Sequence, residues 1–170
     1  MRVKIKKTHP DARIPYKTYF DDFCYDVVAT SCEEVAPNVY KYGIGLAFQI
    51  DRSVTEKVGS MFDTCATDKY VNQEINFRHT PVLLSIDFRP RSSVWKTGMV
   101  LSNCEGTIDE LFVGEVSAVF YHVMPNMPKY EVGDRIGQIK LGMTLPMTFK
   151  EVVELDRTAR ADGSYGSTGK

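Results

Sequence analysis

Most of this chain has the pattern of short strands broken by turns, and at its start hydrophobic and polar residues alternate as they do in a β-strand that packs one face on a core. The alternation begins early, where Val3 and Ile5 stand between lysines and predict a first strand. Pro-Asn and Gly-Asp pairs mark turns farther along. So many short strands predict an all-β fold, closed or in two sheets, because such folds leave few exposed edges. Runs rich in β-branched and aromatic residues predict the later strands at 42–50, 82–88, 115–123 and 134–141.

One segment departs from this pattern. Ser53 and Glu56 have the spacing of a capping box, and apolar residues follow at helical spacing up to Phe62. We expect a helix here and then a polar loop, which together form an insertion between strands over about residues 53–80. The plainest interpretation is a surface helix packed on the domain. The alternative is a regulatory or partner-binding segment.

Composition narrows the class of protein. A chain of 170 residues with 43% hydrophobic and 25% charged residues suits one globular domain. Its net charge of −1 has none of the basic excess of proteins that bind nucleic acid or anionic membranes. No apolar run approaches the roughly 18 residues of a membrane span. The four cysteines and three histidines lack the spacing of a zinc site. We therefore expect a cytoplasmic protein with reduced thiols, and neither nucleic acid nor membrane as a partner.

The stretch 88–98 carries a candidate phosphate site. Arg91 can grip a phosphate with its guanidinium fork, and Ser92 and Ser93 can add hydroxyl donors. The residues that follow are compatible with a helical turn, whose first amides also favour an anion. Taken alone, such a sequence is common on solvated loops, and a solvated loop is the plainer interpretation.

A second candidate lies at 103–115, where Gly106 and Gly114 bracket a pattern typical of a hairpin. Asp109 within it could orient and deprotonate a water, or simply make an Asx-turn. Arg135 and Gln138 follow on the predicted strand 134–141.

The glycine-rich stretch 163–170 is not a P-loop, because Ser164 stands where that motif needs its first glycine. Its composition suits an arm that closes over a bound nucleotide. Tyr165 could stack on a base, Arg160 could grip a terminal phosphate, and amides beside Gly166 could line a polyphosphate. We expect residues 1–156 to form the β-barrel domain and 157–170 to form a flexible arm.

Five stretches in this order resemble the motifs of the trimeric dUTP diphosphatase (dUTPase) family over nearly the whole chain. They are CYDVVA at 24–29, PRSS at 90–93, the segment 103–114, GDRIGQI at 133–139 and the glycine-rich tail. The resemblance implies a jelly-roll homotrimer with active sites between subunits. It also implies hydrolysis of dUTP to dUMP and pyrophosphate with Mg²⁺, which limits uracil incorporation into DNA. The 53–80 insertion would lie between the first two motifs and could bind a protein partner.

The same resemblance implies a role for each site residue. Asp109 and Gln138 would be the catalytic residues, with Asp109 activating the water, and Asp26 would touch the Mg²⁺ through water. The other implied contacts are to substrate: phosphates at Arg91, Ser92, Ser93 and Gln138; uracil at Asn103, Gly106, Thr107 and Ile108; deoxyribose at Phe112; and the closing arm at Arg160, Tyr165, Gly166, Ser167 and Thr168.

Departures from the family pattern leave alternatives open. Ser93 stands at a usual glycine, Leu111 at a common aspartate, and Phe112 at a usual tyrosine. The changes at Ser93 and Leu111 are compatible with a catalytically weak dUTP-binding regulatory protein, whereas Phe112 keeps the ring face and should do little harm. A dCTP deaminase-like enzyme is disfavoured, because Val119 occupies the position of the glutamate that such enzymes need.

Overall fold

The computed structural model describes residues 2–53 and 82–158, and within them lie ten β-strands and one short 3-10 helix. This confirms the all-β prediction. No helix among these residues is long and apolar enough to cross a membrane. The predicted helix that starts at Ser53 falls on 54–81, outside the described residues. The elements are β1 (Arg2–Lys7), β2 (Tyr25–Val28), β3 (Ser31–Ala36), β4 (Val39–Gly43), β5 (Leu46–Asp51), β6 (Leu83–Arg89), η1 (Ser92–Lys96), β7 (Met99–Leu101), β8 (Gly106–Asp109), β9 (Ser117–His122) and β10 (Arg135–Thr144).

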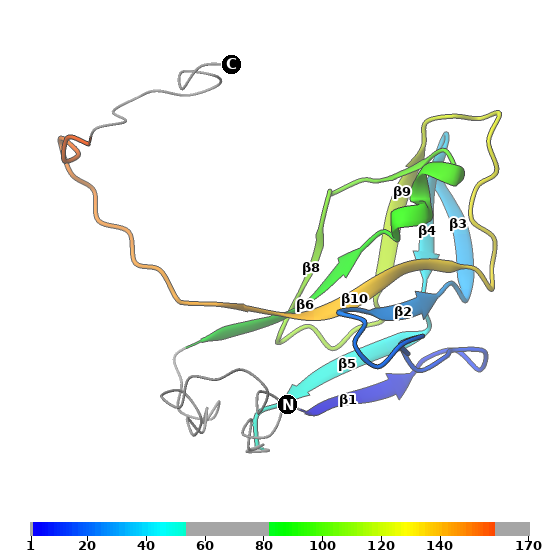
Figure 1. Ribbon diagram of the computed structural model, residues 1–170, viewed down its shortest axis with the longest axis horizontal. Coiled ribbons are helices and arrows are strands. Elements are labelled where there is room, and N and C mark those ends of the chain that lie inside the picture. The colour runs from blue at the N-terminus through cyan, green and yellow to red at the C-terminus, as the bar shows by residue number, and fades with distance from the viewer. Residues whose placement is uncertain (1, 54–81, 159–170) are drawn as a thin grey trace.

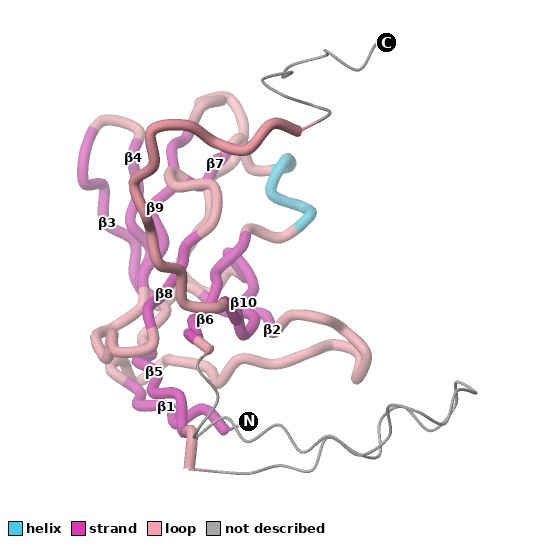
Figure 2. Tube along the Cα trace, turned by 90° about the vertical axis from the view of Figure 1, so that its left-hand side faces the viewer, coloured by secondary structure: helices cyan, strands magenta, loops and turns pink. Residues whose placement is uncertain are grey.

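The strands form two four-stranded antiparallel sheets and one two-stranded ribbon. One sheet has the order β2-β10-β6-β8, the other has the order β3-β4-β9-β7, and β1 pairs with β5. Figure 1 shows β3, β4 and β9 standing together, with β2 and β10 crossing below them and the β1–β5 ribbon beneath. The tube in Figure 2 shows the same grouping from the side. The strand pairings bring segments far apart in sequence onto one sheet, and this positions the site.

Aromatic rings pack edge to face at the centre of the core. Phe120 contacts Tyr42, Phe88 and Tyr130 with ring centroids 5.5–6.3 Å apart, and these rings come from both four-stranded sheets and a loop. Tyr42 is fully buried, and its hydroxyl donates to the carbonyl of Tyr130 at 2.9 Å. Most buried polar atoms in proteins are hydrogen-bonded, and this bond fixes the loop that leads into β10.

The prediction of one strand over 42–50 was wrong. The segment forms the end of β4 and all but the last residue of β5, which belong to different sheets. Gly45 lies between them with a φ of 66°, a backbone conformation that favours glycine. A Cβ at Gly45 would also lie 2.7 Å from the Cβ of His9. The other four predicted strands are confirmed, with ends that shift by a few residues.

Candidate active site

Three strands bring the candidate phosphate residues together. Gln138 of β10 is the register partner of Asp26 on β2 and of Arg89 on β6. Beyond Arg89 the chain turns through Pro90 into η1, whose N-cap residue is Arg91. Motifs from residues 24–29, 90–93 and 133–139 therefore meet at one end of the sheet.

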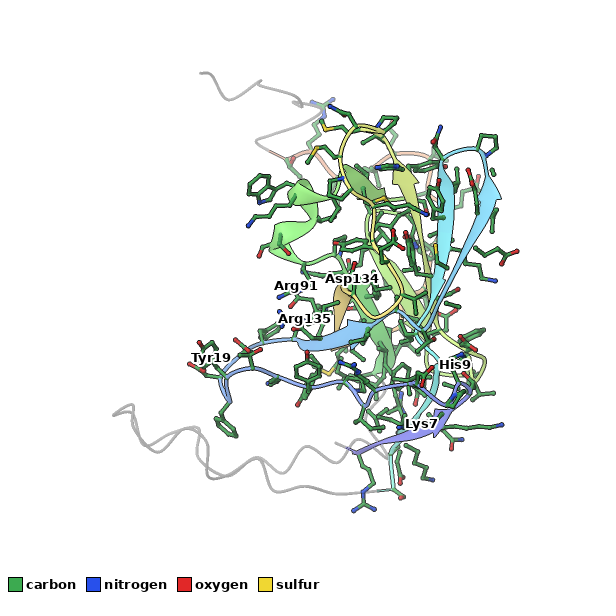
Figure 3. All side chains as sticks on the ribbon, turned by 90° about the vertical axis from the view of Figure 1, so that its right-hand side faces the viewer. Lys7, His9, Tyr19, Arg91, Asp134 and Arg135 are labelled. Carbon is green, nitrogen blue, oxygen red and sulfur yellow. The ribbon has the colours of Figure 1, made fainter. Side chains whose placement is uncertain are left out.

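Asp26 is the centre of this cluster. Its side chain is only 14% exposed, and the guanidinium of Arg135 donates from Nη1 to Oδ2 at 2.9 Å. Arg91 approaches the other oxygen, with Nε 3.4 Å from Oδ1. Figure 3 shows Arg91 and Arg135 near each other, beside the loop that carries Tyr19. One carboxylate thus holds two arginines, and their remaining N–H groups are donors for an anion.

A cleft of about 570 Å³ opens over these residues. Three cationic side chains, Lys17, Arg91 and Arg135, line it together with two carboxylates. Asp26 binds the two arginines, and Asp22 accepts hydrogen bonds from the amides of Thr18 and Tyr19. With the hydroxyl of Ser92 and the amide of Gln138, the cleft suits a phosphate chain. The lining residues are Tyr16, Lys17, Thr18, Tyr19, Asp22, Phe23, Cys24, Asp26, Arg91, Ser92, Arg135 and Gln138.

The cleft lacks a protein cage for a metal ion. Among the residues that the structure describes, no group of three or more His, Cys, Asp or Glu side chains could hold one. Both carboxylate oxygens of Asp26 form ion pairs with arginines. A hard cation such as Mg²⁺ fits this donor set only when phosphate oxygens and water supply most of its ligands.

The candidate base lies elsewhere on the same sheet. Asp109 ends the edge strand β8 and pairs in register with Ser85, whereas Gln138 pairs with Arg89. The two partners, Ser85 and Arg89, are four residue steps apart on β6, which is roughly 13 Å along the strand. Asp109 and Phe112 do not line the cleft, and Phe112 is 48% exposed. One chain therefore places the predicted base and the predicted phosphate ligands in separate locations.

The segment 103–114 is not the hairpin that its glycines predicted. β8 pairs with β6, and a turn follows in which the amide of Phe112 donates to the carbonyl of Asp109 at 3.0 Å. Before β8, Cys104 has a φ of 58° and closes a tight turn after Asn103. Gly106, Thr107 and Ile108 then form the edge strand itself.

Comparison with known proteins decides the family. No profile of a known protein family matches the chain. The deoxyuridine 5'-triphosphate nucleotidohydrolase of Neorickettsia sennetsu is 32% identical over 128 residues, which cover 75% of this chain and 80% of that protein. The chain belongs to the dUTPase family. The Helicobacter pylori (strain P12) enzyme is 29% identical over 170 residues, covering 99% and 97% of the two chains. The Clostridium novyi enzyme is 39% identical over 82 residues, which span 48% of this chain and 58% of that relative.

Solved dUTPases share the fold. A mutant dUTPase of Staphylococcus bacteriophage 80alpha, solved with dUpNHpp, superposes with a TM-score of 0.69 and 18% identity over 99% of both chains. A mutant dUTPase of phage phi11 of S. aureus, solved with a structural Mg(II) ion, superposes with a TM-score of 0.60 and 14% identity, covering 92% of this chain and 100% of that one. The resemblance seen in the sequence is confirmed at the level of family and fold.

The structure shows one residue of the site that the sequence analysis gave no role, Arg135. Arg135 received no role from its motif, although it is the residue that binds Asp26 most closely. Strand alternation alone would put Arg135 and Gln138 on opposite faces of β10, but the register of β10 against β2 shifts between Arg135 and Gly137, which the sequence does not show. Ser93, which replaces a glycine, lies in η1 and carries no positive φ; among the described non-glycine residues only Asn38 and Cys104 do. The arm residues Arg160, Tyr165, Gly166, Ser167 and Thr168 lie outside the described residues.

Proposed function

We propose that this dUTPase hydrolyses dUTP to dUMP and pyrophosphate at sites shared between the subunits of a homotrimer. The observation that carries the proposal is the cleft in which Asp26 holds Arg91 and Arg135 beside Ser92 and Gln138. A triphosphate is the part of dUTP that such a cluster of donors recognises. Membership of the family identifies the nucleotide.

In the proposed reaction Asp109 takes a proton from a water, whose oxygen then bonds to the α-phosphorus. The bond from that phosphorus to the bridging oxygen breaks, and pyrophosphate leaves with the bond's electron pair. Arg91, Ser92 and Gln138 hold the phosphates in line, because hydrolysis at phosphorus depends on positioning and charge neutralisation. Bound Mg²⁺ would supply further neutralisation of the triphosphate, with Asp26 reaching it through water.

The edge position of β8 supports base recognition there. An edge strand presents backbone N–H and C=O groups that no neighbouring strand uses, and a uracil edge can pair with them as a strand would. β8 pairs only with β6 among the described strands. We assign this contact to Asn103 and to Gly106, Thr107 and Ile108, with the ring of Phe112 under the deoxyribose.

The segment after β10 supports assembly. Residues 145–158 run away from the body of the domain (Figure 1), and Phe149 is 90% exposed and Val153 fully exposed. Apolar side chains this exposed in one chain are typical of an interface. In a trimer, the Asp109 turn of one subunit would meet the cleft of another, and the arm residues 160–168 would close over the nucleotide. The partner-binding role of the 53–80 insertion stays a prediction, because 54–81 lie outside the described residues.

The test is pyrophosphate release from dUTP, dCTP, dTTP and UTP in the presence of Mg²⁺. We expect rapid release from dUTP alone. A chain shortened before Gly163 should keep its fold and oligomeric state and lose nearly all hydrolysis. Tight dUTP binding by the full chain without pyrophosphate release would overturn the proposal.

A further inference from the structure

Arg52 joins three parts of the chain that are distant in sequence. It follows β5 directly, at the point where the chain enters 54–81. Its Nε and Nη2 each lie 2.5 Å from an oxygen of Glu110, so the guanidinium and the carboxylate form a two-bond fork. Nη2 also donates to the carbonyl of Val82 at 2.9 Å, where the chain returns towards β6. One side chain thus ties the end of β5 and the approach to β6 to the turn after β8.

Arg52 and Glu110 are both largely buried, and Glu110 accepts hydrogen bonds on its carboxylate. The two side chains are 26% and 22% exposed, well below the exposure of an ordinary surface ion pair. The hydrogen bonds from Arg52 are the main reason that the pKa of Glu110 lies below its usual range, and the amide of Leu84 lowers it further. The planar fork of arginine matches a carboxylate in two places, so it restricts rotation as well as distance.

Glu110 lies in the turn that carries two residues of the proposed site. Glu110 follows Asp109, the proposed base, and stands two residues before Phe112, the proposed support of the deoxyribose. The turn between them extends from an edge strand that pairs on one side only, with β6. Leu111 at its tip is 91% exposed and so contributes little packing. Within the described structure, the Arg52 fork reaches this turn from outside β8 and β6.

We propose that Arg52 is a positioning residue for dUTP hydrolysis, which acts through Glu110 to hold the turn that carries Asp109 and Phe112. The inference rests on the proposed function, because it takes Asp109 as the base. Displacement of a reacting group by about 1 Å can lower a rate by about 100-fold. A loosened turn would therefore lower kcat, while the phosphate cleft, which holds no part of the fork, would keep its geometry.

The experiment compares Arg52→Met, Glu110→Gln and the double variant in the full-length chain, with kcat, KM for dUTP and Tm measured for each. We expect each single variant to lower kcat about 10- to 100-fold with a smaller change in KM. The double variant should be no worse than the singles, because both remove the same fork. The charge-swapped double variant Arg52→Glu with Glu110→Arg should recover part of kcat.

Lys4→Met is the matched control, since it removes a neighbouring ion pair, 3.6 Å from Lys4 Nζ to Asp51 Oδ2, without touching the turn. Its kcat should equal that of the original chain. A merely structural fork would lower Tm and leave kcat at low temperature unchanged in Arg52→Met, and that result would overturn the inference. Failure of the proposed function is distinguishable, because then the unaltered chain itself would release no pyrophosphate from dUTP.

Discussion

The two ends of the β2-β10-β6-β8 sheet differ in how many residues of the proposed site they bring together. At the Asp26 end, residues from three motifs meet, and a carboxylate that is 14% exposed organises two arginines over a cleft. At the Asp109 end, the proposed base lies exposed at the close of an edge strand, followed by Leu111 and Phe112, which contact solvent.

The difference shows which half of the chemistry a single chain can build. Binding of an anion needs fixed donors, and ion pairs within one sheet can preorganise them. Activation of water beside a bound nucleotide needs the base and the phosphates at hydrogen-bond distance, and roughly 13 Å of β6 separates them here. In the proposed homotrimer, a second subunit would bring its turn to this cleft and so resolve the separation.

The largest expected effect is on the exposed end. Asp109→Asn should lower kcat for dUTP by about 10²- to 10⁴-fold, the usual contribution of a general base. Its Tm should stay close to that of the original chain, because the side chain is exposed and the described structure gives it no ion pair. Glu33→Gln, on the fully exposed strand β3, is the control and should keep full activity.

At the Asp26 end of the sheet, Arg91→Met should lower kcat/KM about 10²- to 10³-fold, as loss of one preorganised donor commonly does.

A mixture of the Arg91→Met and Asp109→Asn chains, refolded together in equal amounts, tests whether the two ends of the sheet act in one shared site. If the sites are shared, about a quarter of them in random trimers receive both intact halves, so activity returns. Persistent inactivity of a mixture shown to contain hybrid trimers would mean that each chain builds its whole site alone.

The exposed segment after β10 should matter for assembly. Phe149 is 90% exposed, so Phe149→Asp removes apolar contact area without disturbing the core of the chain. We expect weaker self-association in light scattering, with hydrolysis falling in proportion to the oligomer that is lost. Lys150→Asp, at the next position, should leave assembly nearly unchanged. An equal effect of both substitutions would point to charge rather than apolar contact.

The smallest expected effect is on how the stability of the fold depends on pH, through Asp87 of β6. Burial raises the pKa of Asp87, but hydrogen bonds from Lys140 and Ser85 outweigh it and bring the pKa below its usual range. The ionised carboxylate therefore stabilises the fold above the pKa of the unfolded chain, about 4, and this stabilisation is lost as pH falls through the lower folded pKa.

Asp87→Asn should accordingly reduce the free energy of unfolding at pH 7 by about 1–3 kcal/mol, because Lys140 loses its charged partner. The gap in Tm between this variant and the original chain should narrow as pH falls below about 4. A gap that stays constant across that range would show that the charge of Asp87 contributes nothing. Asp134→Asn is the comparison variant, because it removes a carboxylate that accepts a hydrogen bond from the backbone amide of exposed Glu131.

Much of the fold followed from local patterns. Alternation predicted β1, and runs rich in β-branched and aromatic residues predicted β6, β9 and β10, because both signals appear within a few residues. The composition signal failed between Tyr42 and Ile50, where apolar residues continue across Gly45 although the chain changes sheets. A hydrophobic pattern reports burial, and both sheets bury these side chains in the same core.

The site divides in the same way. By itself the sequence determined the chemical groups and their order: a carboxylate at Asp26, the Arg91-Ser92 pair, Asp109 and Gln138, each within a recognisable motif. Only the tertiary structure decided which of them meet. It places Arg135 on Asp26 across 109 residues of chain, and Arg52 on Glu110 across 58. It also leaves Asp109 at the far end of its sheet. Contacts of this kind depend on strand pairing and register over long loops, and no local propensity encodes them.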